Sequence, residues 1–474
     1  MPEFVKTGWG QATRQPDDAR AAHHVAVRRL VDSYRAIPPH APVRLAKKTS
    51  NLFRARARSS APGLDVSGLG GVISVDPEAR TADVQGMCTY EHLVDASLPH
   101  GLVPLVVPQL KTITLGGAVT GLGIESTSFR SGLPHESVLE MDILTGAGDV
   151  VTATPHGEHA DLFHGFPNSY GTLGYATRLR ISLEEAAPYV ALRHVRFHDL
   201  ETLVATMDDV VRTRAHDGTA VDYLDGVVFS ADESYLCVGV RTPTPGPVSD
   251  YTGQRIYYRS IQHAGEDGAE KHDRLTIHDY LWRWDTDWFW CSRAFGAQDP
   301  RIRRLWPRRY RRSSFYWKLI GYEQRFNIAD RIEKRNGRPP RERVVQDVEV
   351  PIGRTAAFLD WFLTNVPIEP LWLCPLRLRD DAGWPLYPIA GHHTYVNIGF
   401  WSSVPIGPTD GYTNRMIESK VSEFDGHKSL YSDAYYSAEE FDELYGGETY
   451  KTVKKIYDPD SRLLDLYAKA VQRR

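Results

Sequence analysis

The glycine-rich run at residues 112–132 constrains the fold more than any other part of the sequence. It reads Thr-Ile-Thr-Leu-Gly-Gly-Ala-Val-Thr-Gly-Leu-Gly over its first twelve positions and then contains Ser126, Ser128 and Gly132. A backbone without side chains can approach a ligand closely, and successive amide groups with nearby hydroxyls can bind a diphosphate without a lysine. The run lacks GK[ST] and the strand–GxGxxG–helix arrangement, which excludes a Walker A loop and a Rossmann fingerprint. A glycine-rich turn of purely structural use is the alternative.

Two other segments have the composition of a phosphate or nucleotide contact. Residues 44–52 read Arg-Leu-Ala-Lys-Lys-Thr-Ser-Asn-Leu, so that hydroxyls and cations follow an expected strand. Residues 168–177 place Gly171 and Gly174 just before another expected strand, which contains Thr177. A solvated basic loop and an ordinary turn are the respective alternatives.

Composition describes a soluble protein of two or three domains. The chain has 474 residues, of which 42% are hydrophobic and 24% charged, and its formal net charge is −4. The four cysteines lie far apart and form no CxxC pair, so neither a zinc site nor a disulfide framework is expected. No signal peptide or membrane-spanning run is found, which predicts a cytoplasmic location.

Hydrophobic periodicity predicts two mixed domains. We expect a helix over residues 18–36, strands over 72–76 and 81–84, a helix over 89–100 that ends at Gly101, a strand pair within 139–154 and a strand over 176–182. A composition shift near residues 187–189 precedes further strands at 191–197, 221–230, 235–241, 371–378 and 395–402, and helices at 199–214 and 354–365. A closing helix is expected from Ser461.

The order and spacing of the three glycine or hydroxyl segments resemble the FAD-binding domain of the vanillyl-alcohol oxidase and para-cresol methylhydroxylase (PCMH) superfamily. The resemblance implies an α+β fold in which a two-part FAD-binding domain (41–187) follows an N-terminal helical segment (1–40). A mixed α/β cap domain (188–428) would bind substrate, and residues 429–474 would return to the FAD domain. Because residues 47–53 contain no histidine that could tether the flavin, FAD is expected to bind non-covalently.

The resemblance also implies which residues contact FAD. In this sequence they are Lys48, Thr49, Ser50, Asn51, Thr114, Gly116, Gly117, Gly121, Gly123, Ser126, Ser128, Gly171, Gly174 and Thr177, with Lys455 and Tyr457 from a C-terminal KIYDP segment.

Within this superfamily the chain looks closest to the delta-24 sterol reductases. Segments at residues 123–126, 345–351, 371–375 and 430–433 carry that resemblance across both halves. The whole chain is also similar to actinobacterial reductases that convert a 10-methylene fatty acyl chain of a phospholipid into the 10-methyl chain of tuberculostearic acid. That resemblance implies NADPH as electron donor and functional pairing with a methylene-forming lipid methyltransferase. A sterol or isoprenoid side-chain reductase, and an FAD-dependent alcohol or sugar oxidase, are the alternatives.

An isolated alkene has no carbonyl to polarise it, so protonation must accompany hydride delivery. A general acid beside the flavin is therefore expected in a site that excludes water. The candidates are Tyr431, Asp433, Glu125 and His393 with its neighbour His392, each of which could instead be an ordinary buried hydrogen-bonded residue. Four tryptophans are candidates for an acyl pocket or for core packing: Trp282, Trp284, Trp288 and Trp290.

Residues 301–318 contain eight Lys or Arg and no acid, interleaved with aromatic residues. This mixture is typical of contact with an anionic bilayer, at the inner face of the cell membrane for a cytoplasmic protein. A solvated basic face is the alternative. The overall negative charge and the lack of a known nucleic-acid module argue against nucleic-acid binding.

Overall fold

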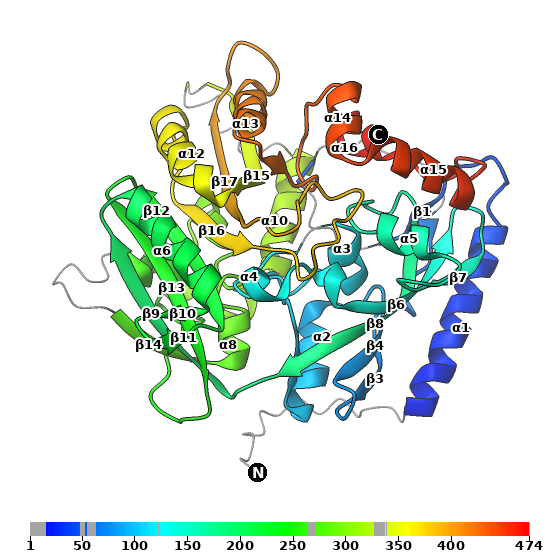
Figure 1. Cartoon of the computed structure of the whole chain (residues 1–474), viewed down its shortest axis with the longest axis horizontal. Coiled ribbons are helices and arrows are strands. Elements are labelled where there is room, and N and C mark those ends of the chain that lie inside the picture. The colour runs from blue at the N-terminus through cyan, green and yellow to red at the C-terminus, as the bar shows by residue number, and fades with distance from the viewer. Residues whose placement is uncertain are drawn as a thin grey trace.

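Two antiparallel sheets organise the molecule, and Figure 1 shows them side by side. The computed structural model describes residues 16–47, 53–54, 63–121, 123–262, 271–326, 337 and 339–473. In these ranges no helix combines the length and the apolar character needed to cross a bilayer. The expected α+β fold is confirmed.

The first sheet lies in the N-terminal half and has the order β3-β4-β8-β6-β7, with β5 also paired to β8. Its strands are β3 (Val72–Asp76), β4 (Thr81–Gln85), β5 (Leu102–Pro104), β6 (Val138–Thr145), β7 (Val150–Ala153) and β8 (Gly174–Glu185). A parallel pair, β1 (Arg44–Leu45) and β2 (Gly63–Leu64), lies apart from it. The helices of this half are α1 (Pro16–Arg35), α2 (Tyr90–Ser97), α3 (Leu115–Thr120), α4 (Ser128–Ser131) and α5 (Ala160–Gly165).

Local sequence explains where α2 begins and ends. The hydroxyl of Thr89 accepts a hydrogen bond from the amide of His92 at 3.3 Å, which caps the N-terminus. A short 3-10 turn follows, and the chain then enters the left-handed region at Gly101, where φ is 73°. Glycine adopts this conformation without steric cost, so the expected end of the helix is confirmed.

The second sheet contains eight strands in the order β14-β9-β13-β12-β16-β17-β15-β18. They are β9 (Tyr189–Phe197), β12 (Tyr223–Ser230), β13 (Glu233–Thr242), β14 (Lys271–Thr276), β15 (Arg341–Pro351), β16 (Leu371–Leu376), β17 (Tyr395–Pro405) and β18 (His427–Lys428). The other elements of this half are α6 (Leu200–Thr213), β10 (Ala215–His216), β11 (Thr219–Ala220), α7 (Tyr257–Ile261), α8 (Ile277–Leu281), α9 (Pro300–Leu305), α10 (Ser313–Phe326), α12 (Ile352–Asn365) and α13 (Tyr412–Glu423).

The second sheet is covered by helices on one face and by the first half of the chain on the other. Successive side chains of a strand point to opposite faces. Thus Val228 joins the core beneath α6 and α12, whereas its neighbour Val227 joins the core shared with the first half. On β15, Val348 and Val350 face the helices. The intervening Asp347 and Glu349 therefore point toward the first half of the molecule.

The C-terminal helices lie against the first half of the chain, as Figure 1 shows in red. They are α14 (Ala438–Leu444), α15 (Gly447–Tyr457) and α16 (Leu466–Ala470), and α15 packs against α5. The expectation of a helix from Ser461 was wrong. Asp458 instead accepts hydrogen bonds from the amides of Arg462 and Leu463, which holds a turn there, and Asp465 caps the helix that follows.

Candidate active site

The glycine-rich run forms a tight corner around the start of α3. Thr114 caps this helix by accepting a hydrogen bond from the amide of Gly117 at 3.2 Å. Lys47 donates to the same threonine hydroxyl at 3.0 Å. A Cβ added to Gly117 would lie 2.8 Å from the Thr114 hydroxyl and 3.7 Å from the Lys47 ammonium. The backbone at Gly117 therefore forms a small cradle, free of side chains, with the Lys47 ammonium at its rim. Backbone amides and a cation are the groups that bind a diphosphate.

The other predicted glycines of this run are required by contacts within the protein. A Cβ at Gly116 would lie 2.6 Å from the carbonyl oxygen of Gly86, and one at Gly121 would lie 2.8 Å from that of Gly117. At Gly123 a Cβ would collide with the rings of Pro108 and Pro134. Close packing of the loop thus accounts for these three residues, and contact with FAD remains a prediction for them.

Ser126 and Ser128 also use their hydroxyls inside the protein. The hydroxyl of Ser126 is 2.9 Å from that of Tyr280, and that of Ser128 accepts a hydrogen bond from the amide of Glu125 at 3.1 Å. Both side chains are buried. Ser126 thus joins the glycine-rich run to α8 in the second half of the chain, whereas Ser128 holds a turn within the run itself.

The segment before β8 combines unusual backbone angles with a buried tyrosine. Gly171 and Gly174 have φ values of 73° and 150°, and Tyr170 has a φ of 50° although it carries a side chain. The hydroxyl of Thr177 donates to the carbonyl of Asp142 at 3.2 Å. Strained backbone of this kind at a non-glycine residue is common at ligand sites.

Four of the predicted FAD contacts lie outside the described residues and have no structural description: Lys48, Thr49, Ser50 and Asn51. Lys47, which precedes them, is described and reaches Thr114.

The inward-facing lysine is Lys454, just before the KIYDP segment, and Lys455, the first residue of that segment, is exposed. Lys454 donates to the carbonyl of Thr172 at 2.8 Å and pairs with the buried carboxylate of Asp458 at 2.6 Å. The hydroxyl of Tyr457 donates to Asp161 at 2.7 Å. These bonds attach the C-terminal segment to the turn before β8. The helical phase of α15 explains why Lys454 faces inward and Lys455 does not, and contact of Lys455 with FAD remains a prediction.

Tyr431 lies at the junction of three parts of the chain. Its carbonyl accepts a hydrogen bond from the amide of Phe53 at 2.9 Å, and its hydroxyl accepts one from the indole of Trp401 on β17 at 3.0 Å. The Tyr431 side chain also faces the carboxylate of Asp347 on β15. Burial raises the pKa of Tyr431 well above its usual range, and Asp347 raises it further. The phenol is therefore a protonated group in an apolar setting.

Two buried carboxyl groups, which we did not predict, lie on the face of β15 that points toward Tyr431. Burial raises the pKa of Asp347 to about 6, although a hydrogen bond from Asn397 at 3.0 Å opposes the rise. Burial also raises the pKa of Glu349 well above its usual range, against a 2.6 Å hydrogen bond from Ser429. Gly399 lies opposite Asp347, and any Cβ there would come within 2.5 Å of the carboxylate. The fold thus makes room for an acid in its interior.

Several buried polar atoms around this tyrosine have no hydrogen-bond partner within the described part of the chain. They include the hydroxyl of Tyr170 and Oδ1 of Asn397, whereas Oε2 of Glu349 and Nε2 of His427 lie 3.4 Å from each other. Unpaired buried polar atoms are costly and rare in folded proteins. Such atoms are expected where a polar ligand binds, and the Tyr170 ring also lies next to Gly121 of the glycine-rich run.

The remaining candidate acids occupy different surroundings. Glu125 is buried 3.0 Å from Arg283, which also pairs with Asp225 at 2.8 Å; burial raises the pKa of Glu125 and Arg283 opposes the rise. Asp433 lies 4.0 Å from Arg343 and 3.8 Å from Arg473. His393 is exposed and bonds the carbonyl of Gly391 in its own loop at 2.9 Å. That exposure contradicts its predicted role, because the general acid needs a site that excludes water.

All four candidate tryptophans are buried, but they divide into two groups. The indole of Trp284 donates to Asp225 at 3.2 Å, and the ring of Trp282 lies 5.7 Å from the Lys111 ammonium. In contrast, Trp290 packs against Trp401 at a centroid distance of 5.3 Å, and Trp288 packs against Trp317 and Phe53. Trp284 in turn lies 6.5 Å from Trp290 between ring centroids and so adjoins the aromatic cluster around Tyr431.

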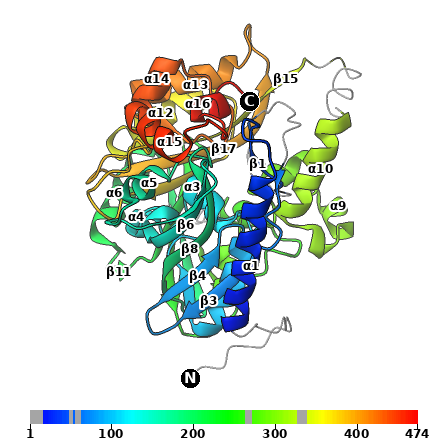
Figure 2. The same ribbon diagram turned by 90° about the vertical axis from the view of Figure 1, so that its right-hand side faces the viewer.

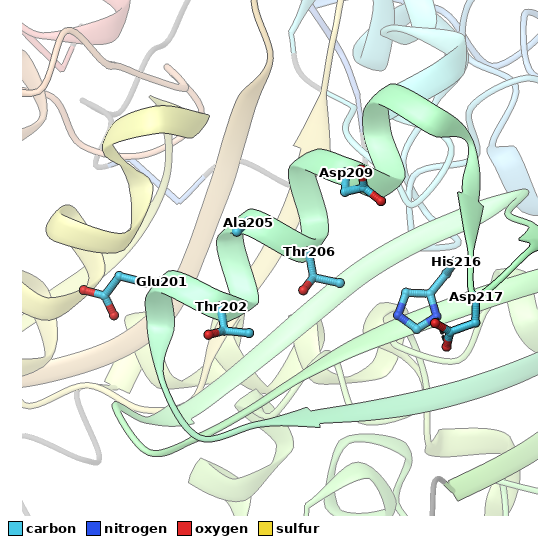
Figure 3. Close-up of a pocket in the computed structure, with 7 residues that line it drawn as sticks. All are labelled: Glu201, Thr202, Ala205, Thr206, Asp209, His216 and Asp217. Carbon is cyan, nitrogen blue, oxygen red and sulfur yellow. Dashed lines mark ion pairs between the residues drawn. The ribbon is translucent and has the colours of Figure 1, made fainter.

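An open depression on the outside of the second half is unrelated to this site. Figure 3 shows that it is lined by α6 and by the turn between β10 and β11, with Glu201, Asp209 and Asp217 at its rim. Most of its lining is exposed, and its three carboxylates do not suit a phosphate-bearing cofactor.

The glycine cradle, its lysine and the unpaired polar atoms fit a large phosphate-containing cofactor that extends from α3 to Tyr431. The chain is an FAD-dependent oxidoreductase, since it contains an FAD-binding domain. Residues 20–154 match a family described as "FAD binding domain".

The chain is homologous to sterol reductases over most of its length. It is 25% identical to human "Delta(24)-sterol reductase" over 414 residues, which cover 84% of this chain and 75% of the human protein. The protein of the same name from Arabidopsis thaliana is 23% identical over 455 residues, or 87% and 77% of the two chains. "Cytokinin dehydrogenase 7" of rice is 32% identical over 202 residues, which cover 41% of this chain and 36% of the rice protein.

Proposed function

We propose that the protein reduces an isolated carbon–carbon double bond in a lipid, using non-covalently bound FAD and electrons from NADPH. The single observation that carries this proposal is Tyr431, a partly buried and protonated phenol that accepts a hydrogen bond from Trp401 within an aromatic cluster. Homology to proteins named Delta(24)-sterol reductase supports reduction over oxidation. The balance is one alkene, one NADPH and one proton consumed for one saturated lipid and one NADP⁺.

The residues of the chain divide the work of this reaction. Lys47, Thr114 and the backbone around Gly117 would hold the diphosphate of FAD, and Tyr170 lies between that run and Tyr431. Bound reduced FAD supplies the hydride. Tyr431 holds the proton at its phenol oxygen, and the neighbouring Asp347 can return a proton to it after each turnover. The aromatic rings of Phe53, Trp288 and Trp401 exclude water from the reacting carbon atoms.

The chemistry of the alkene limits the choice of substrate. Protonation by Tyr431 is favoured where the proton can go to the less substituted carbon and leave tertiary cationic character on the other. The trisubstituted side-chain alkene of a sterol or isoprenoid meets this condition, and the relatives favour it. The 10-methylene group of a stearoyl phospholipid, which becomes the 10-methyl group of tuberculostearic acid, meets it equally. In that case a methylene-forming lipid methyltransferase would supply the substrate.

Lipid analysis tests the proposal and separates the two substrates. Cells that contain the gene and cells that lack it are extracted, and their lipids are compared by mass spectrometry for unsaturated and saturated forms of each candidate. We expect one of the two alkenes to accumulate when the gene is absent. Identical lipid profiles, together with activity of the purified protein toward an alcohol and oxygen, would favour the oxidase alternative.

A further inference from the structure

We propose that α9 and the start of α10 form a surface that docks the protein on an anionic lipid bilayer. Figure 2 shows α9 and α10 on one side of the molecule, with α6, α12 and α15 toward the other. We define the docking surface as the exposed residues Arg301, Ile302, Arg304, Leu305, Arg309 and Lys318. The basic character of residues 301–318 suggested this contact, and the structure shows which of the cations are available for it.

Three of the cations in the segment are used to attach it to the rest of the protein. Arg303 is 1% exposed and makes two bonds to the carboxylate of Asp287, at 2.6 and 3.1 Å. Arg311 is buried and donates to the carbonyl of Thr252 at 2.7 Å, and Arg312 pairs with Glu91. These three arginines are structural, and replacing them would unfold the segment rather than test docking.

The cations of the docking surface have a different environment. Among the described residues, no carboxylate lies within 4.0 Å of Arg301, Arg304, Arg309 or Lys318. The nearby Arg308 does have a partner, since it lies 3.2 Å from Asp250. Cations without a neighbouring acid, on a segment that contains no acid, generate a local positive potential on a chain whose net charge is −4. An anionic partner is therefore favoured.

Large aliphatic side chains lie among these cations and identify the partner as a bilayer. Leu305 is 85% exposed and Ile302 is 43% exposed, both on α9 next to Arg301 and Arg304. A free phosphate or a nucleic acid backbone has no apolar surface that such side chains could contact. The interface of an anionic membrane can bind the cations and the aliphatic side chains together, because headgroups contact the cations while leucine and isoleucine enter the acyl boundary.

The docking surface also continues into the aromatic cluster at Tyr431. Trp317 of α10 lies 5.2 Å from Trp288 and 4.9 Å from Phe53, and Phe53 lies 5.9 Å from Tyr431, between ring centroids. A lipid chain that leaves the bilayer at α9 and α10 would thus follow apolar side chains toward the proton donor. This last step rests on the proposed function, whereas docking itself does not.

Vesicle flotation with the full-length, FAD-loaded protein tests the docking surface. Vesicles of phosphatidylglycerol with phosphatidylcholine are compared with vesicles of phosphatidylcholine alone. The triple variant Arg301→Gln, Arg304→Gln, Arg309→Gln should bind the anionic vesicles on the order of 100-fold more weakly than the wild type, at about fivefold per cation removed. The matched control Arg212→Gln, Arg354→Gln, Lys451→Gln removes the same charge from α6, α12 and α15 and should bind like the wild type.

The variant Leu305→Ser separates insertion from charge attraction. It keeps every cation, so its binding should be weaker than that of the wild type even at a salt concentration that screens the charges. Retained flavin absorbance shows that each variant is folded. Unchanged vesicle binding by the triple variant, or equal binding of the wild type to both vesicle types, would overturn the proposal. Tight binding to heparin without binding to vesicles would overturn it as well and would assign the surface to a polyanion. None of these readouts depends on lipid turnover.

Discussion

At the scale of single residues, the proposed reduction depends on the surroundings of the Tyr431 phenol. Tyr431 accepts a hydrogen bond from Trp401, and burial together with the neighbouring Asp347 raises its pKa and keeps it protonated. A protonated group that is positioned by two partners in an apolar cluster suits proton delivery to a carbon atom. The same surroundings disfavour an oxidation that begins with loss of this proton.

Replacing Tyr431 with phenylalanine tests this role directly. Tyr431→Phe keeps the ring and removes only the hydroxyl, so the variant should bind FAD and accept electrons from NADPH as the wild type does. Lipid turnover should fall by a factor of about 10²–10⁴ because the proton donor is lost. Tyr34→Phe, which removes a buried phenol hydroxyl from α1, is the control. Near-normal turnover in Tyr431→Phe would transfer the role to Glu125 or Asp433.

The unusual pKa of Asp347 predicts a dependence of stability on pH. The folded state raises this pKa from 3.8 to about 6, so folding binds a proton here and stability is lost as pH rises from about 4 to about 6. The shift of about two units corresponds to roughly 3 kcal/mol. Asp347→Asn should therefore be more stable than the wild type above pH 6 by up to this amount, with the difference vanishing near pH 4. Chemical denaturation at several pH values measures it, and a constant difference across this range would contradict the assignment.

The sequence predicted the tyrosine but not the two carboxyl groups. Tyr431 was found because residues 430–433 resemble those of the sterol reductases. Asp347 and Glu349 were missed because a strand with alternating acids normally exposes them to solvent. One sequence signal could have indicated their burial, because Val348 and Val350 alternate with the two acids along β15. This strand lies inside a sheet that is covered on both faces. Only the tertiary structure shows that the second face is covered.

At the scale of single elements, α3 begins in a corner that excludes any side chain larger than hydrogen. A valine at position 117 would push against the Thr114 hydroxyl, which caps the helix and binds Lys47. Gly117→Val should therefore lose FAD during purification, while Gly353→Val should retain it because a Cβ at Gly353 meets no atom within 4 Å. The ratio of flavin to protein absorbance measures retention. Full FAD occupancy in Gly117→Val would place the diphosphate elsewhere.

The attachment of α15 depends on one lysine of an adjacent pair. Lys454→Met would leave the fully buried carboxylate of Asp458 without its cation, which should cost about 2–4 kcal/mol of folding free energy. Lys455→Met changes the exposed neighbour and should cost less than about 0.5 kcal/mol. Urea denaturation of both variants gives the comparison. Equal stability of the two would show that α15 does not depend on this ion pair.

Elements with a clear local signal were predicted closely. The helix over residues 89–100 ended at the predicted Gly101, and the strands expected at 72–76, 81–84, 191–197 and 235–241 are present. The closing helix was misplaced because the sequence after Tyr457 has helical composition, whereas Asp458 binds two backbone amides there and stops it. α15 itself was not predicted. Its stability comes from tertiary bonds such as that from Lys454 to Thr172, which no local pattern reveals.

At the scale of the whole molecule, the two sheets share one core, and the candidate site lies where they meet. The buried set that contains Leu162 and Ile181 of the first half also contains Trp284 and Trp372 of the second. This shared core explains why tryptophans gather in the second half of the chain. From the sequence alone, core packing and an acyl pocket were equal alternatives for them. It also buries Asp347 and partly buries Tyr431.

The central claim is that reduced enzyme passes its electrons to a lipid alkene. In the absence of oxygen, FAD-loaded protein is reduced with one equivalent of NADPH and then mixed with a Delta-24 sterol or with a 10-methylene phospholipid. The account predicts that one of these lipids restores the absorbance of oxidised flavin and yields one saturated lipid per flavin. If neither lipid reoxidises the flavin faster than buffer alone while oxygen does so readily, the protein is an oxidase and the account is contradicted.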